Sequence, residues 1–373
     1  MKGVWGLVHV VRGTLSRDGS RAEPWPLLMK ISPLGPDATA WDRYVTAHPQ
    51  ATFFHQSAWR TVIAQAFNHT PHYLVAEQDG DITGVLPLAQ VKTRLFGHTL
   101  ISLPFCVYGG MLANDAETAA ALAAEAAALG RKLGAAATEM RFLDEPLEGF
   151  LGPNWQRRDA LYVTFRRAIT GDDDANMKAI PRKQRAMVRK GIDRGLVATI
   201  SRDTDGLHRI YAESVRNLGT PVFARRYFRL LAEIFGQAMD VVTIADAGAP
   251  VAAVMNFYWR DEVLPYYGGG TAAARGGYAN DFMYWSTMRL AAARGARMFD
   301  FGRSKAGTGA FAFKKNWGFS PTPLPYFLNL TPGHKIPENN PLNPKYRLMI
   351  AAWQRLPLPV ANVIGPYLVR GVG

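Results

Sequence analysis

Residues 263–319 constrain the fold of this chain most strongly, because three consecutive glycines at 268–270 follow an apolar run typical of a β-strand. Glycine adopts positive φ without steric cost and lets a ligand approach the backbone, so we expect the strand to end there and a loop to begin. Asn280 is a suitable helix N-cap, and Asp281 falls in the first turn, where the helix dipole favours a negative charge. Gly295 stands where a glycine is expected just past the helix end.

A second strand and a cationic loop follow this predicted helix. Residues 298–301 have the pattern of a short strand, and Arg303 and Lys305 lie just past its end. Lys314 and Lys315 follow on a second short helix. Helix N-termini and clustered cations both suit an anionic ligand, so we predict an anion site either at the start of the first helix or at the cationic loop. A plain tight turn at the glycines is the competing interpretation.

Four strings in the second half of the chain resemble one protein family. They are ANDFMYW at 279–285, FDFGRSK at 299–305, FKKNWGF at 313–319 and LPLPVAN at 356–362. In this order they resemble the FemAB-related acyltransferases of the exosortase/PEP-CTERM-associated subgroup, over nearly the whole chain from residue 29. The resemblance implies an α/β (α+β) fold of two GNAT-like (N-acyltransferase) domains, each a mixed, mostly antiparallel sheet flanked by helices.

The same resemblance implies an enzyme, an N-acyltransferase that moves an acyl or aminoacyl group to an amine of a cell-envelope or exopolysaccharide precursor. It implies acyl-CoA or aminoacyl-tRNA as co-substrate and no tightly bound cofactor. The expected partners are a phosphorylated or lipid-linked sugar precursor and tRNA, met in the cytoplasm or at the inner face of the membrane. The alternative is a non-catalytic basic module that recruits tRNA or a polysaccharide precursor to an exosortase-linked assembly.

Acyl transfer to an amine needs a bound donor, a neutral amine and stabilisation of the tetrahedral oxyanion. By resemblance, Lys314 is the first catalytic candidate, as a compact charge near the substrate diphosphate or the transferring carbonyl. Asp281 and Tyr267, with Tyr284 as an alternative, are candidates for taking the amine proton, whereas Asp300 is expected to be structural. The expected substrate-binding residues are Arg303, Ser304, Lys305, Lys315, Tyr284, Arg182, Arg185 and Arg189.

The most basic stretch of the chain precedes the second half. Lys178, Arg182, Arg185 and Arg189 are spaced four, three and four residues apart, so one continuous helix would place them on one face. Arginine forks match pairs of phosphate oxygens, which favours a phosphate-binding face. A solvated helix face is the alternative.

Composition and the absence of certain motifs limit the classes of protein to which the chain can belong. The formal net charge of +13 indicates either a polyanionic partner or a merely cationic surface. The single cysteine, Cys106, excludes a disulfide within the chain and fits a reducing compartment, and no apolar run reaches the length of a transmembrane helix. Motifs for a metal site, a Walker loop and a GxSxG elbow are absent from the sequence. The GNAT phosphate loop has only a partial match at 275–277, which counts against simple acetyl-CoA binding.

The order of predicted elements divides the chain into domains. Residues 1–28 lack a globular pattern and form either a disordered tail or a misassigned extension ahead of a natural start at Met29. Residues 29–170 and 196–330 each have the element order of a GNAT-like domain, which indicates an internal duplication. The basic stretch is the linker helix between them, at 171–195.

The C-terminal part, residues 331–373, is a Pro-rich and docking tail. The proline-rich stretch begins at Pro321, before this tail, and is expected to wrap the surface. A short helix at 346–355 and an apolar run at 360–369 are expected to dock on a domain. The competing interpretation is a tail that contacts the membrane interface. The sequence leaves open the acyl donor, the acceptor, the oligomeric state and whether the first domain also binds a ligand.

Overall fold

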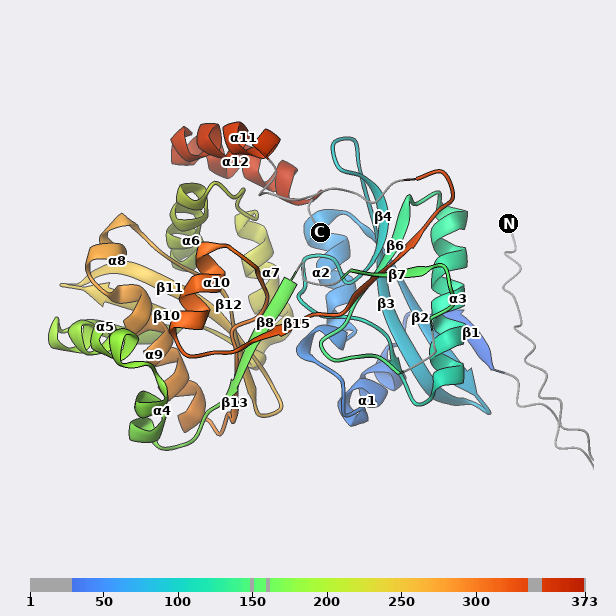
Figure 1. Cartoon of the computed structure of the whole chain (residues 1–373), viewed down its shortest axis with the longest axis horizontal. Helices are drawn as coiled ribbons and strands as arrows, with labels where there is room; N and C mark the ends of the chain where they lie inside the picture. Colours follow the sequence, from blue (N-terminus) through green and yellow to red (C-terminus); the bar gives the residue numbers. More distant parts are fainter. Residues whose placement is uncertain (1–28, 148–150, 159–161, 335–343, 372–373) are drawn as a thin grey trace, which may run out of the picture. The chain divides into compact units, whose positions relative to one another are not determined.

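The computed structural model describes residues 29–147, 151–158, 162–334 and 344–371, and the expected N-terminal extension lies outside this range (Figure 1). The chain divides into two compact units. The first comprises the described residues of 29–64, 68–158 and 325–334. The second comprises those of 65–67, 162–324 and 344–371.

The first unit is a mixed sheet with helices, and its strand order is β1-β2-β3-β4-β6-β16-β7, with β5 beside β3. Its elements are β1 (Lys30–Pro33), α1 (Thr39–Ala47), η1 (Phe53–His55), α2 (Ala58–Phe67), β2 (Thr70–Gln78), β3 (Asp81–Thr93), β4 (Gly97–Ser102), β5 (Leu112–Ala113), α3 (Ala116–Leu133), β6 (Ala137–Arg141), β7 (Trp155–Arg158) and β16 (Tyr326–Leu330). Strands β4 and β6 are parallel and are connected through α3, whereas the other pairs are antiparallel.

The second unit repeats this plan, with the strand order β14-β8-β13-β12-β11-β10-β9 and β15 beside β8. Its elements are β8 (Tyr162–Ala168), α4 (Asp173–Ala179), α5 (Arg182–Asp193), β9 (Val197–Ser201), α6 (Thr204–Leu218), α7 (Arg225–Phe235), η2 (Gly236–Ala238), β10 (Met239–Asp246), β11 (Ala249–Trp259), β12 (Glu262–Gly270), α8 (Ala272–Gly276), α9 (Ala279–Ala293), β13 (Met298–Asp300), β14 (Ser304–Lys305), α10 (Gly309–Asn316), β15 (Pro321–Pro323), α11 (Pro344–Arg355) and α12 (Leu358–Val369). Here β12 and β13 are the parallel pair, connected through α9. Two mixed, mostly antiparallel sheets flanked by helices are therefore confirmed.

Two strands lie in a different unit from the one expected, so the structure divides the chain differently from the expected boundaries. Strand β8, expected in the first domain, pairs with β13, β14 and β15 of the second sheet. Strand β16, expected in the second domain, lies between β6 and β7 of the first sheet. The run Tyr326–Leu330 is apolar apart from Asn329 and contains no proline, so it can hydrogen-bond on both edges. It is buried, and only the exposed β15 before it fits the expectation of a surface wrap.

The three glycines are the last residues of strand β12 and do not form the expected loop. Residues Gly268 to Gly270 pair with Ala252 to Val254 of β11. An ideal β-carbon at Gly269 would lie 2.5 Å from Ser214 Cβ of α6. The glycines are therefore needed because helices pack directly onto this strand.

The basic stretch is two helices, not one. Helix α4 ends at Ala179 and α5 begins at Arg182, with Pro181 between them. Proline disfavours helical backbone in the residue before it, which breaks the helix at Ile180. Lys178 therefore does not share a helix face with the arginines of α5.

The helix after the glycines begins at Ala279, with Tyr278 as its N-cap at φ 62°. Asn280 is thus inside the helix and is not the predicted N-cap. Asp281 does lie in the first turn. Within the described ranges, no helix combines the length and apolarity needed to cross a bilayer.

Candidate functional site

The two parallel strands of the second sheet separate after a short contact. Pairing joins Glu262 to Met298 and Val263 to Phe299. Beyond this point β12 continues to Gly270, whereas β13 ends at Asp300 and the chain turns away. In open α/β sheets, ligands bind beyond the carboxyl ends of such strands. The predicted cationic loop lies at this end of β13.

Lys314 of α10 closes the turn that follows β13. Its Nζ atom donates hydrogen bonds to the carbonyl oxygens of Gly302 and Arg303, both at 3.0 Å. The same atom lies 5.7 Å from the ring centre of Phe165. Burial among these groups lowers the pKa of Lys314 to about 7, although the nearby Asp300 carboxylate raises it and Arg303 lowers it further. Near neutral pH this amine therefore exchanges between its charged and neutral forms.

Aromatic side chains fix α10 so that Lys314 is held at this position. The Thr308 hydroxyl accepts a hydrogen bond from Phe311 N and caps the helix. The Phe311 ring packs edge-on against Phe165 of β8. Trp317, just past the helix, is fully buried. The sequence string FKKNWGF is thus an anchored helix end with one inward lysine.

A partly buried ion-pair network, centred on Asp300, also supports this turn. Asp300 is buried, accepts a hydrogen bond from Gly302 N at 2.7 Å and pairs with Arg166 Nε at 3.2 Å. Arg166 also pairs with Glu262 at the start of β12. Burial raises the pKa of Glu262, and Arg166 opposes that shift. The expected structural role of Asp300 agrees with this geometry, whereas sequence reasoning missed Arg166 and Glu262.

The predicted cations of the loop gather on one aromatic ring. Arg303 lies 4.7 Å and Lys305 5.9 Å from the ring centre of Tyr162 in β8. Ser304, between them, is buried, and its hydroxyl makes no hydrogen bond within the described residues. Lys315 is exposed on the outer side of α10. The structure therefore brings Arg303 and Lys305 together on Tyr162, and Arg303 is also close enough to Lys314 to lower its pKa. Lys315 lies aside.

Asp281 connects three helices. Its Oδ1 atom accepts hydrogen bonds from Trp317 Nε1 at 2.9 Å and from the Gln184 side chain of α5. Burial raises the pKa of Asp281, and these two hydrogen bonds oppose the shift. The carboxylate thus has a packing role beside any role as a base.

Tyr284 and Tyr267, the two tyrosine candidates, lie in different aromatic clusters. The Tyr284 ring packs against Phe301 and Phe313, next to Lys314, and burial raises the pKa of Tyr284 to about 12. The Tyr267 hydroxyl hydrogen-bonds the Tyr227 hydroxyl at 2.6 Å, and both rings are buried. Tyr284 is therefore the tyrosine that neighbours the lysine, as a neutral hydrogen-bond donor.

The arginines predicted to bind substrate from the basic stretch have separate roles. Arg185 donates to the carbonyl oxygens of Ile180 and Lys178, at 3.2 and 3.3 Å, and so caps the end of α4. Arg182 and Arg189 are exposed. The expected phosphate face thus reduces to two exposed arginines.

The start of α9, the other predicted anion site, is less suited to a phosphate. The short helix α8 precedes it, and an ideal β-carbon at Gly277 would lie 3.6 Å from the Asp246 carboxylate. Arg194 pairs with that carboxylate at 2.8 Å. The carboxylate near Gly277 is consistent with the merely partial match to the GNAT phosphate loop. Of the two predicted anion sites, the loop after β13 is therefore the better suited.

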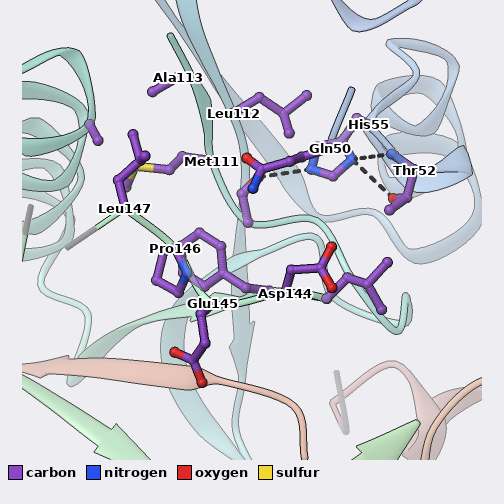
Figure 2. A pocket seen from close by; sticks show the side chains of 14 residues that line it. Gln50, Thr52, His55, Met111, Leu112, Ala113, Asp144, Glu145, Pro146 and Leu147 are labelled. Atoms are coloured by element: carbon purple, nitrogen blue, oxygen red, sulfur yellow. Dashed lines mark hydrogen bonds between the residues drawn. The ribbon is translucent and has the colours of Figure 1, made fainter. Parts of the chain in front are cut away.

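A separate hollow lies in the first unit, near the start of α3 and beyond the end of β6 (Figure 2). His55 lines it, accepts a hydrogen bond from Thr52 N at 3.0 Å and lies 3.0 Å from Gly110 O. Burial lowers the pKa of His55 to about 4, so the ring is neutral at physiological pH. Among the described residues that line the hollow, the acidic side chains are Asp144 and Glu145, and none is Lys or Arg.

The comparisons with known proteins agree with this geometry. Residues 176–315 match a family profile described as an acetyltransferase (GNAT) domain. This range includes β12, β13 and Lys314. No curated protein matches the chain by sequence.

Solved structures share the fold of both units. FemX is 15% identical, with 79% of this chain and 96% of FemX covered and a TM-score of 0.61. A tandem GNAT protein from the clavulanic acid biosynthesis pathway, solved without AcCoA, is 14% identical, with 80% and 97% covered and a TM-score of 0.52. L-PGS from Bacillus licheniformis is 11% identical, with 86% and 98% covered and a TM-score of 0.51. Residues 176–315 thus match a GNAT domain, and the chain shares its fold with FemX and a tandem GNAT protein.

Proposed function

We propose that this protein is a cytoplasmic N-acyltransferase whose reaction centre lies beyond the carboxyl ends of β12 and β13. It moves an acyl or aminoacyl group from acyl-CoA or aminoacyl-tRNA to an amine of a cell-envelope or exopolysaccharide precursor. By its sequence strings we assign it to the exosortase/PEP-CTERM-associated FemAB-related subgroup. The observation that carries the proposal is the amine of Lys314, held by the carbonyls of Gly302 and Arg303 in the same loop that carries the cations Arg303 and Lys305.

The two hydrogen bonds of Lys314 suit a proton acceptor. A neutral amine has two N–H bonds, which the carbonyls of Gly302 and Arg303 satisfy, so its lone pair is left to receive a proton. An amine with a pKa of about 7 is well matched to proton transfer at neutral pH. In the protonated form, the third N–H is available to donate to an oxyanion.

In the proposed reaction, the acceptor nitrogen attacks the carbonyl carbon of the donor thioester or ester. The new C–N bond forms, the acceptor amine passes a proton to Lys314, and the ammonium stabilises the oxyanion of the tetrahedral intermediate. The intermediate then expels the thiolate or alkoxide, and the leaving group takes the proton. Arg303 and Lys305 bind phosphate groups of the donor or the acceptor, and Tyr284 donates a hydrogen bond.

The direct test separates the two donor classes. The purified chain is incubated with acetyl-CoA or aminoacyl-tRNA and a panel of nucleotide-linked amino sugars and muramyl peptides, and the acceptor mass is followed. We expect an amide product from one donor class. If neither donor yields an amide while tRNA binds tightly, the chain is a binding module, the role to which its exposed Arg182 and Arg189 would also be suited.

A further inference from the structure

Helix α12 is apolar on both of its sides. Its sequence, LPVANVIGPYLV, contains no charged residue. Ala361 and Val369 are buried on the inner side, whereas Val363, Ile364 and Tyr367 are exposed to 67%, 40% and 73%. A helix that is apolar all round is normally buried in a core or in a membrane. The outer side of α12 therefore has the composition of a surface that is covered in the functional state.

Helix α11 extends this apolar surface. Leu348 and Met349 are exposed to 82% and 63%. Of the twelve large apolar side chains that are exposed in the described part of the chain, six lie in these two helices. Single exposed apolar residues are ordinary, but such a concentration marks an interaction surface. We call it the C-terminal apolar face, formed by Leu348, Met349, Val360, Val363, Ile364 and Tyr367.

Specific contacts hold both helices on α6 and its C-terminal loop, so the face is fixed outward (Figure 1). Arg216 donates to Gln354 O at 3.1 Å, and the Gln354 side chain donates to Asn217 O at 3.2 Å. Gly365 allows α12 to pack closely, since an ideal β-carbon there would lie 2.9 Å from Val222 O. The inner sides of both helices are thus used for packing on α6, and the apolar face remains available.

The charge of this segment indicates what covers the face. From residue 339 to residue 373 the chain contains no Asp or Glu, and its charged residues are Lys345, Arg347, Arg355 and Arg370. Apolar helices that are too short to span a bilayer and are flanked by cations lie in the plane of an anionic lipid interface. A second copy of the chain fits less well, because a two-fold interface would bring the cations of one copy close to the same cations of the other.

We propose that α11 and α12 form a docking surface for an anionic lipid bilayer, with the C-terminal apolar face inserted at the level of the headgroups. This inference is independent of the proposed chemistry, since it uses none of the residues of the reaction centre. It adds a direct lipid contact that keeps the enzyme at a membrane surface.

Vesicle sedimentation tests the proposal. The full chain is mixed with vesicles of phosphatidylcholine alone or with phosphatidylglycerol added, at low and high salt. We expect binding to the anionic vesicles that weakens as salt is raised. The combined variant Val363→Gln, Ile364→Gln, Tyr367→Gln should bind at least about tenfold more weakly, because it loses the inserted apolar groups.

A matched variant carries the same number of changes at other exposed apolar positions: Leu95→Gln, Ile192→Gln and Val197→Gln. It should bind as the native chain does. Arg355→Gln is the second probe and should weaken binding by about fivefold, the contribution of one interfacial cation. It decides the outcome if the triple variant fails to fold.

Three results would overturn the proposal. The first is a native chain that stays in the supernatant with anionic vesicles. The second is binding that the triple variant and Arg355→Gln leave unchanged. The third is a native dimer that ignores vesicles and dissociates in the triple variant, which would make the face a contact between copies.

Discussion

Asp300 and Lys314 bind the same glycine from its two sides. Asp300 Oδ1 accepts the hydrogen bond of Gly302 N at 2.7 Å, and Lys314 Nζ donates to Gly302 O at 3.0 Å. The turn after β13 is therefore held between a carboxylate and an amine whose charges influence each other. The position and the protonation of Lys314 are properties of this arrangement, and the first prediction follows from it.

The kcat of the enzyme should rise with pH through a midpoint of about 7, where Lys314 loses its proton. Arg303 lowers the pKa of Lys314, so Arg303→Gln should move the midpoint to higher pH. Asp300 raises that pKa, so Asp300→Asn should move the midpoint to lower pH. The pH profile of kcat at saturating substrate measures both shifts, and a midpoint that neither substitution moves would assign the titration to another group.

Substitutions at Asp281 should separate packing from proton transfer. Asp281→Asn keeps an oxygen that accepts from Trp317 and Gln184, so it should retain stability and most of the activity. Asp281→Ala leaves the buried Trp317 N–H without this partner and should lower the free energy of unfolding by about 1–3 kcal/mol. If Asp281→Asn is stable and loses turnover by a factor of a hundred or more, roughly the effect of one lost acid–base group, Asp281 is a base.

The strand glycine at 269 should be intolerant of any side chain. Gly269→Ala places a methyl group against Ser214 and should destabilise the protein by about 1–3 kcal/mol. The Ser214→Gly change removes the atoms that the methyl group meets and should recover part of the loss. Denaturant unfolding of the two single variants and the double variant measures the coupling, and simple additivity would contradict this packing.

The buried His55 should make the first unit sensitive to acid. Its folded pKa of about 4 lies below the ordinary value of 6.5, so below 6.5 the unfolded chain takes up a proton that the folded chain refuses. The stability contributed above pH 6.5 is lost as pH falls toward 4, by an amount on the order of 3 kcal/mol. Urea titrations at pH 7 and pH 4.5 measure the free energy of unfolding of the native chain and of His55→Gln, and the variant should lose less of it on acidification. An equal loss in both proteins would assign the acid sensitivity to another group.

Local signals in the sequence predicted the elements whose order defines the fold. The alanine-rich helix α3 has Asp115 as its N-cap and Gly134 as its C-cap, both readable from the sequence. The sheets to which β8 and β16 belong were predicted wrongly, because strand pairing depends on residues far apart in the chain. Nothing in the run Tyr326–Leu330 shows that its partners are β6 and β7, nearly two hundred residues earlier.

The candidate site was predictable only where resemblance or a charge pattern marked it. Arg303, Lys305 and Lys314 lie in family strings; the structure places Arg303 beside Lys305 on Tyr162 and within electrostatic reach of Lys314. Arg166 carried no signal, because its partners are far away in the chain and meet only when β8 pairs with β13. Lys178 shows the opposite error, since one ideal helix face was assumed across a proline that separates α4 from α5.

Replacing the amine of Lys314 tests the central claim most directly. Lys314→Met keeps an apolar stem of similar length and removes the charge and the proton acceptor, whereas Lys315→Met makes the same change on the exposed side of the helix. We expect kcat to fall roughly a hundredfold in Lys314→Met, as for one lost oxyanion-stabilising group, with a folded protein and little change in Lys315→Met. Near-native kcat in Lys314→Met, or a loss confined to Lys315→Met, would contradict the account and transfer the chemistry to Arg303 and Lys305.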